Sequence, residues 1–158
     1  MVSYLEDDDW WSVNELERVR HAWQKNPRLV YFYNGRIDVS IEGKRLKHTI
    51  TDNWNYWGWN NSLVSISRKL LSDNITHLSR LRIALDIFNF FVALSSHAPM
   101  LFTKECLTYY RVSQPLKSRF YDIWEDLLVI RKMILEHKSY DAFKRFSEMF
   151  AYKIFTAF

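Results

Sequence analysis

Cysteine, glycine and proline are scarce in this sequence of 158 residues, with one, three and three copies respectively. A single cysteine, Cys106, cannot form an intramolecular disulfide bond, so the sequence predicts no disulfide framework. The low glycine and proline content argues against collagen-like repeats and low-complexity linkers. We therefore expect one packed domain, for which a hydrophobic content of 48% is sufficient.

Long apolar runs are also missing. The longest apolar stretch, Ile83–Leu94, is interrupted by Asp86 and Asn89 and is too short to span a bilayer. A signal peptide would begin with basic residues followed by an apolar stretch. The start of this sequence is acidic instead, so no signal peptide is predicted. We expect a cytoplasmic protein. The last helical segment, Tyr140–Phe155, suits peripheral membrane contact, and packing on the domain or on a second chain is the alternative.

The charge balance is mildly basic, with 22 Lys and Arg against 18 Asp and Glu, a net charge of +4 and a pI near 9.2. This excess permits contact with anionic lipid, nucleotide or nucleic acid but requires none of them. Nucleic-acid binding is not expected, because no recognition motif is present and the densest charge is the acidic run Glu6–Asp9.

The first part of the chain predicts a strand, a helix and a hairpin. Val2–Leu5 is typical of a strand. Ser12 and Glu15 match the S-x-x-E capping box, and the apolar residues that follow recur at helical spacing up to Asn26-Pro27. Asn34-Gly35, between two strand-like runs, is a strong hairpin signal, although a longer loop would also fit.

The rest of the chain predicts a loop, a buried helix, two strands and two amphipathic helices. Thr51–Asn61 is rich in Asn and Trp and lacks any period, which indicates a loop. Leu78–Ser95 is the clearest helix and should be buried on most sides. The later elements are expected at Met100–Phe102, Leu107–Val112, Leu116–His137 and Tyr140–Phe155. The fold class is therefore mixed α and β: a short mixed sheet flanked by helices, followed by a helical C-terminal region.

Four segments in this order resemble family-2 glycosyltransferases, the inverting enzymes of the GT-A fold. The segments are the acidic run Glu6–Asp9 with the aromatic, helix and strand behind it, Asn60–Leu71, Leu81–Leu94 and Pro99–Ser113. The resemblance implies a partial GT-A-like domain over residues 1–113. Residues 114–158 would form helices packed on the same domain.

In that family a βαβαβ half that holds the nucleotide precedes the acidic cluster and takes about one hundred residues. This chain has no counterpart of it. The resemblance therefore predicts a truncated transferase, or half of a split enzyme completed by a second chain. The alternative is a non-catalytic remnant that binds a protein partner, or forms a homo-oligomer, through its open strand edge.

Carboxylates two residues apart occur twice in the acidic run, as Glu6/Asp8 and Asp7/Asp9. Hard divalent cations prefer carboxylate oxygens and can neutralise a diphosphate leaving group. By resemblance, Asp8 and Asp9 would hold Mn²⁺ or Mg²⁺, and Glu6 and Asp7 would contact the donor. The alternative is an acidic segment that favours the dipole of the following helix.

By resemblance, Asp86 is the catalytic base that takes the proton of the acceptor hydroxyl, although Leu85 stands where the family has Glu. An ion pair with Arg82 on the same helix face is the alternative. Arg111 would bind the donor diphosphate, or else form a structural salt bridge. Ser113 replaces the His with which the family motif ends.

The acceptor sugar would be contacted by Trp57, Trp59 and Asn60, because rings stack on sugar faces and amides bond to hydroxyls. An irregular loop held by buried indoles is the alternative. The implied activity is transfer of a hexose from a nucleotide-diphospho-sugar to a glycan or lipid-linked acceptor, with inversion at the sugar carbon.

Overall fold

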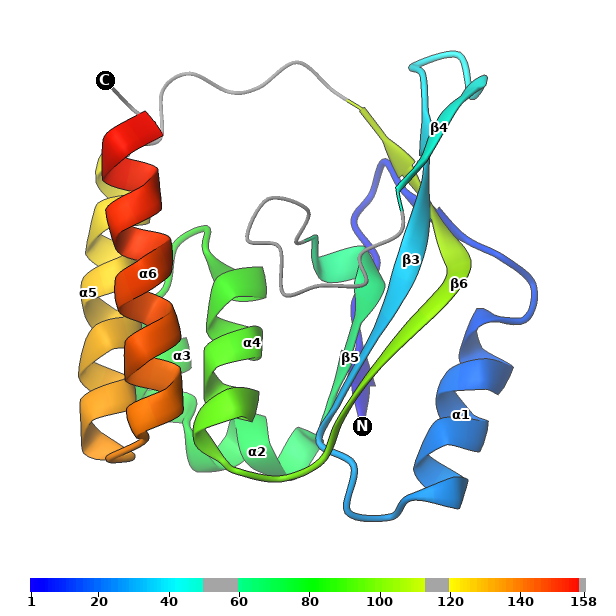
Figure 1. Cartoon of the computed structure of the whole chain (residues 1–158). Helices are drawn as coiled ribbons and strands as arrows, with labels where there is room; N and C mark the ends of the chain where they lie inside the picture. The colour runs from blue at the N-terminus through cyan, green and yellow to red at the C-terminus, as the bar shows by residue number, and fades with distance from the viewer. Residues whose placement is uncertain (50–59, 113–119, 157–158) are drawn as a thin grey trace.

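The computed structural model describes residues 1–49, 60–112 and 120–156, and a mixed sheet with helices on both sides forms its centre (Figure 1). The elements are β1 (Val2–Ser3), β2 (Trp10–Trp11), α1 (Glu15–Lys25), β3 (Tyr31–Val39), β4 (Arg45–Thr49), the 3₁₀ helix η1 (Asn61–Leu63), β5 (Val64–Ile66), α2 (Arg68–Asp73), α3 (Ile75–Leu78), α4 (Leu85–Ser95), β6 (Met100–Arg111), α5 (Phe120–Glu136) and α6 (Tyr140–Thr156). The predicted mixed class is confirmed.

The sheet has the strand order β1-β5-β3-β6-β2, and β4 pairs with β3 as a hairpin. The central pair, β3 with β6, is parallel, whereas the other pairs are antiparallel. Parallel neighbours need a long crossover connection, and here α2, α3 and α4 provide it. As a result, the end of β6 returns to the acidic residues at the start of the chain.

The predicted hairpin at Asn34-Gly35 is wrong, because β3 runs through this dipeptide without a turn. The Asn34 side chain is fully buried and donates to Glu15, so the residue serves a buried polar network instead of a turn. The turn comes later, between β3 and β4, where the Gly43 N–H donates to the Ser40 carbonyl and Gly43 takes a φ of +79°.

Gly35 is required by close packing between β3 and β6. A Cβ at this position would lie 3.1 Å from Cys106 Sγ and 3.2 Å from the carbonyl oxygens of Lys104 and Glu105. The β3–β6 register shifts on both sides of Gly35, which marks an irregularity in the pairing. The two strands predicted at Met100–Phe102 and Leu107–Val112 are therefore one strand, β6, that continues through it.

The first helix ends as predicted but begins differently. The N–H of Asn26 donates to the Ala22 carbonyl and closes α1. The predicted capping box is wrong: α1 begins at Glu15, Asn14 occupies the N-cap without a side-chain bond, and the Glu15 carboxylate points into the sheet. The buried contacts of Glu15 with Asn34 and Thr108 replace the capping role that its position in the sequence predicts.

The buried helix is shorter than predicted. Residues 79–84 do not continue it, and α4 starts at Leu85. The physical reason lies on α5, where the fully buried Asp126 carboxylate accepts the N–H groups of Arg82, Ile83 and Ala84 at 2.7–3.1 Å. A distant carboxylate thus satisfies the backbone just before the helix.

One large core joins the sheet to the helices. Its buried residues come from β3, β5, α4, α5 and α6, and α4 lies between the sheet and the α5–α6 pair (Figure 1). As predicted, α4 is buried on most sides. A smaller core under α1, formed by Val19, Ala22, Leu29, Phe32 and Leu107, covers the other face. None of the helices in residues 1–49, 60–112 and 120–156 is long and apolar enough to cross a membrane.

Candidate metal centre

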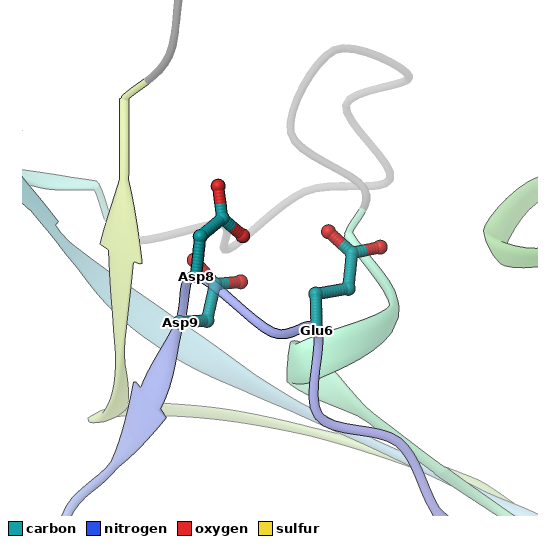
Figure 2. A group of neighbouring side chains, drawn as sticks. All are labelled: Glu6, Asp8 and Asp9. Carbon is teal, nitrogen blue, oxygen red and sulfur yellow. The ribbon is translucent and has the colours of Figure 1, made fainter.

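Three carboxylates gather between β1 and β2. Glu6, Asp8 and Asp9 each offer an oxygen, and these oxygens lie within 4.8 Å of one another. Figure 2 shows Asp8 and Asp9 on one side of the connecting turn and Glu6 opposite them. Three carboxylate oxygens in reach of one point are suitable ligands for a hard divalent cation such as Mg²⁺, Mn²⁺ or Ca²⁺.

The segment before β5 fixes Glu6 at both its backbone and its side chain. The Glu6 N–H donates to Ser62 Oγ at 2.9 Å. The amides of Asn60 and Asn61 donate to the two carboxylate oxygens at 2.9 and 3.1 Å. Asn60, which the resemblance placed near an acceptor sugar, thus holds a member of the acidic cluster. Asn61 and Ser62 were not singled out by the sequence.

Asp9 is the buried member of the cluster, with 7% of its surface exposed. One oxygen, Oδ1, accepts the N–H of Arg111 at 2.9 Å, whereas Oδ2 is buried and has no hydrogen-bond partner in the described part of the chain. Burial raises the pKa of Asp9, the Arg111 amide and the nearby Ser62 and Asn60 side chains lower it, and Asp8 raises it. An orphaned oxygen beside two other carboxylates fits a cation, which would satisfy the oxygen and offset the repulsion.

Arg111 is near the cluster, as the resemblance implies, but through its backbone. Its guanidinium lies 5.7 Å from the centre of the Trp10 ring, which itself stacks on Tyr109. The Nε atom is buried without a hydrogen-bond partner among the described residues. The structure therefore brings together chain segments about one hundred residues apart, joined by the bond from Arg111 to Asp9.

Tyr110 adds a phenol beside the cluster that the sequence did not single out. Burial raises its pKa, the Arg36 cation lowers it, and Asp9, Glu6 and Asp8 raise it. The Arg36 guanidinium lies 4.2 Å from the centre of the Tyr110 ring and pairs with Asp38 at 2.8 Å.

Asp86 is half-buried in the first turn of α4, where its Oδ1 accepts the Ile87 N–H at 2.8 Å. Its charge contributes to raising the pKa of the buried Tyr31. Burial raises the pKa of Tyr4, and the Asn89 amide, one turn further along α4, lowers it in part, although the Asn89 side chain has no hydrogen-bond partner among the described residues.

The remaining predicted site residues lie outside this cluster. Asp7 is exposed and does not belong to the group of three carboxylates. Trp57 and Trp59 fall outside the residues that the structure describes. Trp11 is structural, since its Nε1 donates to the Ser62 carbonyl at 2.8 Å.

A buried network under the cluster is centred on Glu15, which is 2% exposed. Its oxygens accept Asn34 Nδ2 at 2.6 Å and the Thr108 hydroxyl at 3.2 Å. Thr108 is also in bonding distance of Asn34 Oδ1 and the Ser62 carbonyl, both at 3.1 Å. Burial raises the pKa of Glu15 to about 7. The helical capping pattern concealed this role.

Comparison of the sequence with protein-family models finds no match, and comparison with curated proteins finds none either.

Proposed function

We propose that this chain is a glycosyltransferase-like protein of the family-2 kind, with a partial GT-A-like domain that binds a divalent cation and a nucleotide-diphospho-sugar. The observation that carries the proposal is the acidic cluster of Glu6, Asp8 and Asp9 beside the end of β6. Two of the four segments behind the resemblance, Glu6–Asp9 and Pro99–Ser113, lie far apart in sequence and meet at this point.

The cation would neutralise the diphosphate that leaves from the donor. Asp8 and Asp9 would be its ligands, with Glu6 as the third oxygen donor. The fixed hydrogen bonds to Glu6 and Asp9 hold two of these side chains in place before any ligand arrives. Such preorganisation lowers the cost of binding.

Asp86 would act as the base toward the acceptor hydroxyl. Its half-buried place in the first turn of α4 supports this role, because a base must be held in position and remain reachable. The acceptor would be a glycan or a lipid-linked sugar, and a second chain would complete the nucleotide pocket.

The test is calorimetry and tryptophan fluorescence with Mn²⁺, and then with UDP or GDP in the presence and absence of Mn²⁺. We expect Mn²⁺ to bind, and Asp8→Asn to weaken it by about tenfold or more. Asp7→Asn removes the same charge from the same run outside the cluster, and should change affinity by about twofold at most. Nucleotide binding that requires Mn²⁺ supports the donor site. Equal effects of the two variants argue against the metal centre.

A second candidate is a non-catalytic module that binds a protein partner. Within the described residues, β1 is the last strand of the sheet on its side, and the neighbouring Met1 and Leu5 are about half exposed. An open strand edge can pair with another chain. If neither Mn²⁺ nor about 1 mM nucleotide binds, this candidate replaces the transferase.

A further inference from the structure

A cavity lies on the helical side of the molecule, in the groove between α5 and α6. Its volume is about 480 Å³, which falls in the range typical of small-molecule sites. The α5–α6 pair is separated from the sheet by α4, so this groove is independent of the acidic cluster (Figure 1).

The groove has an apolar floor and an apolar wall. Leu127 and Phe146 form the deepest part, with 4% and 3% exposure, and the Phe150 ring lies 6.0 Å from that of Phe146. Trp124 packs against Phe150 at 5.1 Å. The wall is formed by Leu128, which is 50% exposed. A flexible hydrocarbon chain is the ligand that such a surface favours.

Among the described side chains, Arg131 is the only ionisable one that lines the groove, and it makes no ion pair with any of them. Two acids of α5 are engaged elsewhere: Glu125 pairs with Arg82, and Glu136 contacts His77 and Lys132. A ligand with an apolar body and one anionic end would therefore find a complementary charge at the groove.

We propose that this groove binds a single-chain anionic amphiphile such as a fatty acid, with the chain over Phe146 and Phe150 and the carboxylate at Arg131. A second copy docked by the same face would place two Arg131 side chains in one interface, which is unfavourable. A bilayer fits less well, because residues 120–156 carry six basic and six acidic side chains and so lack the basic excess that favours anionic lipid.

The experiment titrates dodecanoate below its micellar concentration, by calorimetry and by intrinsic tryptophan fluorescence, to which Trp124 contributes. Dodecyltrimethylammonium has the same chain with a positive head and serves as the ligand control. We expect one equivalent of dodecanoate to bind, about tenfold more tightly than the cation, and Arg131→Gln to remove this preference. Leu128→Glu should abolish binding. Leu135→Glu makes the same change at an exposed leucine of α5 outside the groove, and should leave binding intact.

Three results would overturn the proposal. The first is an affinity for dodecanoate that neither Leu128→Glu nor Arg131→Gln changes. The second is a dimer in sedimentation that Leu128→Glu dissociates while dodecanoate does not bind, since the groove is then a contact between copies. The third is binding to phosphatidylglycerol vesicles without saturable binding of dodecanoate, which indicates a membrane surface.

Discussion

Glu15 couples the stability of the protein to pH, because its carboxyl is buried in a network with fewer hydrogen-bond donors than acceptors. Thr108 has one hydroxyl hydrogen and three oxygen acceptors around it, so a protonated Glu15 can supply a further donor. The pKa of Glu15 is about 7 in the fold and about 4.5 without it. Between these values the folded state binds more protons than the unfolded state. The contribution is therefore complete below about pH 4.5 and is lost as the pH rises through 7.

We expect the free energy of unfolding to fall by roughly 2–3 kcal/mol between pH 5 and pH 8 from this group. Urea unfolding at several pH values measures it. Glu15→Gln keeps the shape without the ionisation, and should flatten this part of the profile. Glu17→Gln, an exposed change on the same helix, should leave the slope as it is. An unchanged slope in Glu15→Gln would assign the pH dependence to other groups.

The acidic cluster shows what sequence can predict about single residues. The oxygen-rich run Glu6–Asp9 was visible as a candidate metal site, because carboxylate spacing is local. The pairing of Asp9 with the Arg111 backbone and of Glu6 with Asn60 and Asn61 depends on the sheet order. No pattern within a short window carries that information.

At the scale of elements, helix α4 depends on a single residue of α5. Asp126 accepts three backbone N–H groups, and removing it leaves these donors without partners. We expect Asp126→Ala to cost about 3 kcal/mol or more of the unfolding free energy. Hydrogen exchange at Arg82, Ile83 and Ala84 should accelerate before global unfolding. Glu125→Gln breaks only an exposed ion pair and should cost about 1 kcal/mol at most.

Strand β3 can pack closely against β6 because Gly35 has no side chain. Gly35→Ala places a Cβ against two backbone carbonyls and the Cys106 sulfur, and should cost about 1–3 kcal/mol in denaturant unfolding. Adding Cys106→Ala should restore only part of it, since the carbonyls remain. Gly43→Asn at the open turn should stay within about 0.5 kcal/mol, because Asn tolerates positive φ. Full rescue by Cys106→Ala would contradict the backbone contact.

The misplaced elements share one cause. Periodicity located α1, α5, α6 and the end of α4 within a few residues, because an apolar face is a local pattern. The predictions were wrong where a residue with a local sequence signal has a tertiary partner instead. Glu15 accepts from Asn34 rather than completing a capping box, and Asn34 lies within a strand rather than in a turn. The early start assigned to α4 failed for the same reason, since Asp126 lies some forty residues further along the chain.

At the scale of the whole molecule, the continuous core predicts cooperative unfolding. Phe146 of α6 is 3% exposed and its ring lies 5.4 Å from that of Phe91 on α4. We expect Phe146→Ala to lower the free energy of unfolding by about 3–5 kcal/mol. The loss should appear equally in far-ultraviolet circular dichroism and in the hydrogen exchange of β3. If α5 and α6 melted first while β3 stayed protected, the helical pair would be a separate unit.

The parallel pairing of β3 with β6 also has a consequence for the order in which the chain acquires its structure. Tyr31 pairs with Met100 and Val39 with Arg111, so each contact closes a loop of about 70 residues. During synthesis the β3–β4 hairpin and the crossover helices emerge first, and β3 can pair with β6 only after β6 has been made. The central pairing is therefore a late event, and refolding should be slow compared with that of a helical bundle of the same length.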